Sequence, residues 1–234
     1  MKGNAIREYI EKSIKGDRVM KKKVLIVGGV AGGASAAARL RRLDEYAEII
    51  MFEKGEYISF ANCGLPYYIG DVIPTREALI VQTVEQMSRK FNLDIRNLSE
   101  VISINKEEKK ISVKNYRTGE VYEESYDTLV LSPGAKPIKP PIAGIEDCKN
   151  LFTLRNIPDM DNIKSFLEEE KPKRAIVIGG GFIGLEMAEN LHEKGVNVTL
   201  VEGSNQVMGP LDIEMASIIH SHLIDNGVDL ILND

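Results

Sequence analysis

The chain has 234 residues, a length that allows one large domain or two modest ones. Its 30 Lys and Arg against 35 Asp and Glu give a net charge of −5, so neither nucleic acid nor a membrane is expected as the main partner. No apolar run reaches the roughly 18 residues needed to span a bilayer. The two cysteines exclude a disulfide scaffold and a cysteine-rich zinc site. With no secretory signal in the sequence, a cytoplasmic location is expected.

Residues 1–19 are charged and polar, with only a weak helical pattern. Met20 precedes a lysine-rich stretch and a strand, which is typical of a natural start. We interpret 1–19 as an extension that is disordered or a non-native start. A partner-binding helix is the alternative.

The first informative unit begins with the apolar run at 24–27, typical of a parallel strand buried on both faces. A glycine-rich turn follows at 28–33, and the alanine-rich stretch after it favours a helix. The run at 49–52 predicts a second strand, which ends at the acid Glu53. This order predicts a βαβ dinucleotide-binding unit.

The same order recurs about 150 residues later. A strand is predicted at 175–178, a glycine turn at 179–184 and a helix at 185–194, followed by Gly195 and by a strand at 196–201 that ends at Glu202. The second turn fits G-x-G-x-x-G fully, whereas the first has Val30 at the middle glycine position. A glycine-rich hairpin is the alternative, and the helix directly after each turn argues against it.

Between the two units, 101–104 and 110–114 alternate like antiparallel strands, and a turn precedes Val121, which predicts a small meander. A buried strand at 129–131 leads to a proline-rich crossing segment at 133–141. The fold class is therefore α/β, with two Rossmann-like βαβ domains and an antiparallel meander inserted in the first. We place the domains at 20–150 and 151–234, the second incomplete.

A glycine turn at a helix N-terminus presents free N–H groups to a pyrophosphate, and the acid that ends the second strand accepts hydrogen bonds from a ribose. Two such units in one chain favour FAD in the first and NAD(P)H in the second, so that hydride can pass between them. Glu202 would repel a 2′-phosphate, which favours NADH, with NADPH as the alternative.

Cys63 precedes Pro66, which suits the first turn of a helix, so the thiol is expected near a positive helix end that favours the thiolate. No second cysteine stands two or five residues away, so a redox role needs a mixed disulfide, a persulfide or a sulfenic acid. A buried structural cysteine is the alternative. Cys148 follows Glu146 and Asp147, whose charges disfavour the thiolate, and it is expected to be inert.

At this point the chain resembles a known family. The first glycine turn, the Ser-Phe-x-x-Cys motif at 59–63, the stretch at 131–135 and the second glycine turn are similar to the single-cysteine branch of the pyridine nucleotide–disulfide oxidoreductases. Within that branch, the stretch at 59–67 resembles the coenzyme A-disulfide reductases, including those fused to a rhodanese domain.

The resemblance implies roles for individual residues. Cys63 is the expected catalytic nucleophile, which alternates between thiolate and a mixed disulfide with CoA. The residues expected to contact CoA are Ser35, Arg39, Arg42, Ser59 and Asn62. Those expected at FAD are Gly28, Val30, Ala31, Gly32, Gly33, Glu53, Lys54, Ser132, Pro133 and Gly134. Those expected at NAD(P)H are Gly179, Gly180, Gly181, Phe182, Ile183, Gly184 and Glu202. No metal site is expected.

Arg39 and Arg42 lie three residues apart on one predicted helix face, which suits a phosphate-rich ligand. A solvated surface face is the alternative.

The resemblance implies an FAD-dependent NAD(P)H oxidoreductase that reduces CoA disulfide or a related low-molecular-weight persulfide or polysulfide, with hydride passing from NADH to FAD to Cys63. It implies a cytoplasmic homodimer. The alternatives are an NADH oxidase or peroxidase that cycles Cys63 through sulfenic acid, and a non-catalytic nucleotide-binding fragment. Because the family's chains are longer than this one, we expect the 234-residue chain alone to be inactive.

Overall fold

The structure is a computed structural model that describes residues 21–234, so the extension expected at 1–19 lies outside the described residues. The chain divides into two compact units. Among the described residues, the first holds 21–60 together with Gln82–Gly134, and the second holds Ala61–Val81 together with Ala135–Asp234. This division follows contacts, whereas the expected boundary near Asn150 follows the two glycine turns. The segment Ala61–Val81, which carries Cys63, therefore groups with the second turn.

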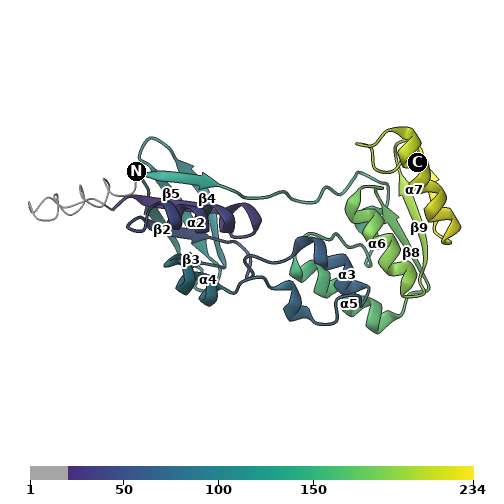
Figure 1. The fold of residues 1–234 in the computed structure, drawn as a ribbon, viewed down its shortest axis with the longest axis horizontal. Helices are drawn as coiled ribbons and strands as arrows, with labels where there is room; N and C mark the ends of the chain where they lie inside the picture. The colour runs from purple at the N-terminus through teal and green to yellow at the C-terminus, as the bar shows by residue number, and fades with distance from the viewer. Residues whose placement is uncertain (1–20) are drawn as a thin grey trace, which may run out of the picture. The chain divides into compact units, whose positions relative to one another are not determined.

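A four-stranded parallel sheet forms the centre of the first unit, in the order β3-β2-β1-β7. Its strands are β1 (Lys23–Val27), β2 (Glu48–Phe52), β3 (Asp94–Arg96) and β7 (Thr128–Leu131). Figure 1 labels strands β2 and β3 of this sheet. The three apolar runs predicted as strands of this unit are confirmed. β1 pairs with β2 on one side and with β7 on the other, and its Leu25 and Ile26 are fully buried because both faces of the sheet are covered.

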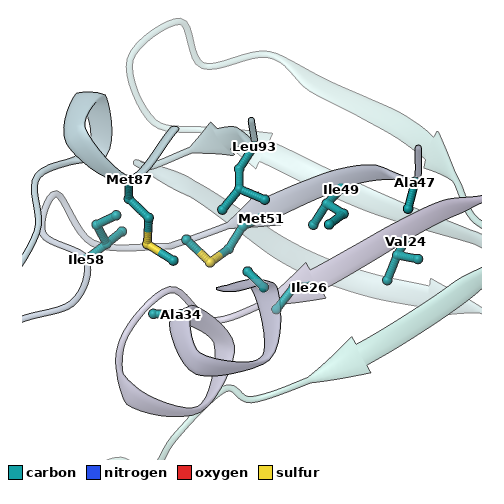
Figure 2. Packing of buried hydrophobic residues seen from close by; sticks show 10 residues of the cluster. Val24, Ile26, Ala34, Ala47, Ile49, Met51, Ile58, Met87 and Leu93 are labelled. Carbon is teal, nitrogen blue, oxygen red and sulfur yellow. The ribbon is translucent and has the colours of Figure 1, made fainter. Parts of the chain in front are cut away.

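Helices α2 (Ala31–Leu43) and α4 (Val84–Phe91) cover one face of this sheet. Figure 2 shows the cluster they share with the strands, in which Ala34 of α2 and Met87 of α4 pack with Ile26 and Met51. The residues that α2 buries against the sheet are small, namely Gly33, Ala34 and Ala37.

An antiparallel sheet covers the other face. Its strands, in the order β4-β5-β6, are β4 (Ser99–Asn105), β5 (Lys110–Asn115) and β6 (Val121–Ser125). Ile111 and Val113 of β5 are buried in one cluster with Leu25, Ile50 and Phe52 of the parallel sheet. The predicted meander is confirmed, and its alternating pattern exists because one of its faces is a core face.

The second unit is built on the parallel strands β8 (Arg174–Ile178), β9 (Asn197–Glu202) and β10 (Asp229–Leu232), in the order β10-β9-β8. Helices α6 (Phe182–Glu193) and α7 (Ile213–Asp225) contact this sheet. Leu200 and Val177 are register partners, and Leu200 is fully buried. Their neighbour Ile176, which points to the opposite face, is 70% exposed.

Two further helices belong to this unit, α3 (Leu65–Ile69) and α5 (Ile157–Glu170), and α3 contacts both α5 and α6 (Figure 1). Short 3-10 turns occur at η1 (Asn62–Gly64), η2 (Arg76–Leu79) and η3 (Ile145–Asp147). The proline-rich stretch at 133–141 has no regular structure, as predicted. Across residues 21–234, no helix is long and apolar enough to cross a membrane.

The helices after the two glycine turns begin earlier than predicted. α2 begins at Ala31 and α6 at Phe182, so Gly33 and Gly184 each lie inside the first turn of a helix. An ideal Cβ on Gly33 would lie 1.7 Å from the carbonyl oxygen of Gly28, and one on Gly184 would lie 1.9 Å from that of Gly179. The last glycine of each turn is therefore a packing requirement of the helix start rather than part of a preceding loop.

Candidate functional site

The first glycine turn joins β1 to α2. Gly28 has a φ of +96°, and its N–H donates to the carbonyl oxygen of Phe52 at 2.8 Å. An ideal Cβ on Gly28 would lie 2.0 Å from the carbonyl oxygen of Ser132, and one on Gly32 would lie 3.1 Å from the Ser132 Oγ. The end of β7 thus lies against the glycine turn. The structure brings Ser132 together with Gly28 and Gly32 of the turn predicted to bind FAD, and the exposed Pro133 and Gly134 follow it.

The second turn joins β8 to α6 in the same way. Gly179 has a φ of +103°, and its N–H donates to the carbonyl oxygen of Val201 at 2.8 Å. Ideal Cβ atoms on Gly179 and Gly181 meet no atom within 4 Å. Phe182 and Ile183, which open α6, are 68% and 54% exposed. The turn therefore presents an open, uncovered surface where the predicted nucleotide would lie.

Each strand-ending acid is bonded to its own glycine turn. Glu53 accepts hydrogen bonds from the N–H groups of Gly29 and Gly55, both at 2.7 Å. Glu202 accepts from the N–H of Gly180 at 2.7 Å and from Ser204. The Ser204 hydroxyl, with the N–H of Gly180, lowers the pKa of Glu202 below its usual value of 4.5. The Glu202 carboxylate is therefore ionised at neutral pH at the position predicted for a ribose.

The repeat extends beyond the residues that the sequence singled out. In each copy, the glycine whose N–H donates to the acid also contacts an apolar side chain that stands five residues after that acid. Ile58 packs on Gly29, and Val207 packs on Gly180. The next residue in each copy donates its N–H to that glycine's carbonyl, at 3.2 Å from Ser59 and 2.8 Å from Met208. Both donors have a left-handed φ. Aligning the two copies past their acids would have found this matched pair of loops.

The N–H groups that open both long helices suit an anionic ligand. The N-caps of α2 and α6 are Val30 and Gly181, and no side chain in the described part of the chain bonds to these helix starts as a cap. The free N–H groups and the helix dipole together favour a phosphate at each turn. Both turns thus fit the phosphates of a dinucleotide.

Cys63 lies in η1, directly before α3, and its thiol is free and exposed. Pro66 occupies the first turn of α3, as predicted. The Oδ1 of Asn62 is buried and has no hydrogen-bond partner among the described residues. Burial, together with the carboxylates of Glu186 and Glu189, raises the pKa of the nearby Tyr67. The exposed thiol disagrees with the alternative of a buried structural cysteine, and beside it stands an unsatisfied polar atom.

The predicted CoA residues are divided between the two units. Ser35, Arg39 and Arg42 lie exposed on α2 of the first unit, which also contains Ser59. Asn62 and Cys63 belong to the second unit. The intervening arginine of α2, Arg41, is structural, because its guanidinium donates to backbone carbonyls including that of Phe91 at 2.8 Å. This contrast leaves Arg39 and Arg42 as the outward-facing pair.

Two other predicted residues have local partners. Lys54 forms an exposed ion pair with Glu100 at 2.8 Å. Cys148 is exposed, and its Sγ lies 3.7 Å from the carbonyl oxygen of Gly144. Within residues 21–234, no group of three or more His, Cys, Asp or Glu side chains could hold a metal ion.

Two glycine turns on parallel sheets and an exposed cysteine define a class of nucleotide-dependent redox protein. Residues 22–234 match the family model described as pyridine nucleotide-disulphide oxidoreductase, and the chain belongs to that family. It is 44% identical over 193 residues to the coenzyme A disulfide reductase of Staphylococcus epidermidis, covering 82% of this chain and 43% of that protein. The resemblance noted in the sequence is thereby confirmed.

Solved structures agree. The reduced CoADR-RHD protein of Bacillus anthracis has a TM-score of 0.90 and 65% identity, over 93% of this chain and 39% of that one. An NAD-dependent persulfide reductase from A. fulgidus has a TM-score of 0.84 and 36% identity, over 90% of this chain and 39% of that one. The predicted α/β fold with two Rossmann-like units is confirmed. The chain spans less than half the length of these relatives.

Proposed function

We propose that the protein is an FAD-dependent NAD(P)H oxidoreductase that reduces CoA disulfide, or a related persulfide or polysulfide, through the single thiol of Cys63. The exposed Cys63 thiol, in a chain that also has two nucleotide turns, is the observation that carries the proposal. The similarity to coenzyme A disulfide and persulfide reductases supports the same substrate class. As the resemblance implies, we also propose that the complete protein is a cytoplasmic homodimer.

The Cys63 thiolate would attack one sulfur of the substrate disulfide. A bond forms between the Cys63 Sγ and one CoA sulfur, the substrate S–S bond breaks, and the other CoA leaves as a thiolate. This step conserves electrons, because one disulfide is lost and one is formed. Returning the mixed disulfide to the Cys63 thiolate then requires two electrons. When bound, the flavin and the nicotinamide would supply those electrons.

The remaining predicted residues would bind and orient these groups. The turn at 28–33, with Glu53 and Ser132, would hold FAD in a domain at 20–150, and the turn at 179–184 would hold the nicotinamide nucleotide in a domain at 151–234. The ionised Glu202 supports NADH over NADPH, because a 2′-phosphate would meet its charge. Arg39 and Arg42 on α2 offer two exposed cations to the phosphates of CoA.

The thiol step is tested by intact-mass measurement on the 234-residue chain mixed with CoA disulfide. We expect a covalent adduct of one CoA that a reductant removes. The adduct should be lost in Cys63→Ser and retained in the matched control Cys148→Ser, which removes the other exposed cysteine. Adduct formation that continues at the wild-type rate in Cys63→Ser would contradict the role of Cys63.

An NADH oxidase or peroxidase is the second candidate, favoured by the exposure of the Cys63 thiol, which leaves it open to peroxide and the formation of sulfenic acid. NADH-dependent consumption of oxygen or peroxide, compared with release of free CoA thiol, separates the two activities in the complete protein.

We propose that the 234-residue chain alone does not turn over, since it spans 43% of the S. epidermidis protein.

A further inference from the structure

The loop that follows β9 contacts the second glycine turn at Gly180. At Gly180, the N–H donates to Glu202 at 2.7 Å and the carbonyl accepts from the N–H of Met208 at 2.8 Å. The side chain of Val207 packs on the same glycine, and Val207 is fully buried. The conformation of Gly180, the second residue of the turn, therefore depends on the positions of Val207 and Met208.

His220 fixes the position of that loop. It lies on α7, and its Nε2 accepts a hydrogen bond from the N–H of Val207 at 3.1 Å. An accepting Nε2 means that the imidazole is neutral and carries its proton on Nδ1. Val207 is buried, so without His220 its N–H would lose its partner away from water, which is unfavourable. The His220 side chain thus holds the loop at Val207, the residue that packs on Gly180.

We propose that His220 is a positioning residue of the nucleotide site. By holding Val207 and Met208, its neutral imidazole fixes the orientation of the Gly180 peptide group. The Gly180 peptide in turn fixes the positions of the N–H groups that open α6 and of the Glu202 carboxylate. The ligand it serves is the pyrophosphate and adjacent ribose of NAD(P)H. The inference rests on the proposed assignment of the turn at 179–184 to that nucleotide.

The alternative is that His220 only stabilises the second unit. The two roles differ in what they predict for substitutions. A purely structural His220 would lower the melting temperature when replaced and leave the nucleotide affinity of the folded protein unchanged. A positioning His220 affects the affinity, and a side chain that restores an acceptor to the N–H of Val207 restores the affinity.

The test compares His220→Leu, which has no acceptor, with His220→Gln, whose amide oxygen can accept. NADH affinity is measured by fluorescence titration of the 234-residue chain, together with thermal melting. We expect NADH binding about tenfold weaker in His220→Leu, in line with the loss of one buried hydrogen bond. Binding in His220→Gln should stay within about threefold of wild type. His222→Leu is the matched control, since His222 is exposed on the same helix, and it should bind NADH as wild type does.

Wild-type affinity in folded His220→Leu would overturn the inference while leaving the nucleotide assignment intact. Failure of the wild-type chain to bind NADH would overturn that assignment and the inference with it. If His220→Leu does not fold, His220→Asn takes its place, because its shorter side chain withdraws the acceptor from Val207 but keeps the polarity. Folded His220→Asn with wild-type affinity would also overturn the inference.

Discussion

The glycines of the second turn are required for different reasons. A side chain on Gly184 would meet the backbone carbonyl of Gly179 at 1.9 Å, so this glycine is needed for the fold itself. Gly181 has an ordinary φ of −81° and open space where its Cβ would be. Nothing in the described residues requires a glycine there, so its role is expected to appear only when a ligand approaches the backbone.

Substituting each of these glycines by alanine should separate folding from binding. Gly184→Ala is expected to lower the free energy of unfolding by about 1–3 kcal/mol, because a backbone carbonyl cannot move aside. Gly181→Ala should leave stability unchanged or raise it by less than about 1 kcal/mol. It should nevertheless weaken NADH binding about tenfold, because the methyl group blocks the close approach of the pyrophosphate. Urea unfolding and NADH titration measure both effects. Equal NADH affinity in Gly181→Ala and wild type would contradict the nucleotide assignment of this turn.

At single-residue resolution, the sequence predicts what local motifs encode and misses what the tertiary fold assembles. Glu53 and Glu202 were predicted as ribose acceptors from their place at strand ends, and the structure adds that each is bonded to its own turn. Val207 and His220 were missed, because the hydrogen bond between them joins a loop to a helix surface 13 residues later. Neither residue belongs to a motif that spacing reveals.

At the scale of elements, one carboxylate joins the segment after α3 to two longer helices. Asp71 pairs with Lys164 of α5 at 2.5 Å and with Lys194, which caps the end of α6. Lys164 also donates to the carbonyl of Tyr68 at 2.8 Å and lies over its ring. Hydrogen bonds from Lys164 and Lys194 lower the pKa of Asp71 below its usual 3.8. The short helix α3, which follows Cys63 in the chain, is thus held in place by ion pairs as well as by packing.

Asp71→Asn should loosen this junction. Asparagine tolerates the left-handed φ of +64° at this position, so the substitution removes charge without backbone strain. We expect the free energy of unfolding to fall by about 1 kcal/mol at neutral pH. The effect is small because the Asp71 side chain is 60% exposed. Glu168→Gln is the control, because Glu168 pairs with the same Lys164 at the longer distance of 3.9 Å. Its effect on the free energy of unfolding should be within about 0.5 kcal/mol.

The pH dependence follows from the lowered pKa of Asp71. Its contribution to stability is complete above pH 3.8 and is lost as the pH falls through the lowered pKa. Urea unfolding at neutral and acidic pH should therefore show the wild type and Asp71→Asn converging at the acidic end. A constant difference between them at all pH values would show that the carboxylate charge is not responsible.

The sequence predicts five strands of the parallel sheets, the antiparallel meander and helices α2 and α6, but it does not predict α4, α5, α7, β3 or β10. Continuous apolar runs predict strands of both parallel sheets; in the first sheet they occur because both faces are covered, whereas in the second the run of β8 leaves Ile176 exposed on an open face. The starts of α2 and α6 were placed three residues late, because glycine is a poor helix former in isolation. Here the first helical turn tolerates glycine because a closely packed carbonyl leaves no room for a side chain.

For the whole chain, the sequence indicated two repeats but not which segments join each compact unit. The stretch Ala61–Val81 follows the first repeat, yet it groups with the second unit. Its contacts explain this, since α3 packs on α5 and α6, and Gly70 lies so close to Asn190 that an ideal Cβ would be 2.1 Å from the Asn190 Oδ1. Such packing joins residues that are about 100 positions apart, and no local pattern encodes it.

The covering of the second sheet is uneven, and this gives the last prediction. Leu200 faces the helices and is fully buried, whereas Ile176 on the opposite face is 70% exposed. Leu200→Ala is expected to cost about 2–5 kcal/mol of unfolding free energy, because it leaves a cavity. Ile176→Ala should cost less than about 1 kcal/mol and should reduce the binding of a hydrophobic fluorescent dye to the folded 234-residue chain. Urea unfolding and dye titration of the two variants compare the two faces directly. An equally large loss of stability in Ile176→Ala would mean that the open face is covered in solution, and dye binding by the wild type should then be absent.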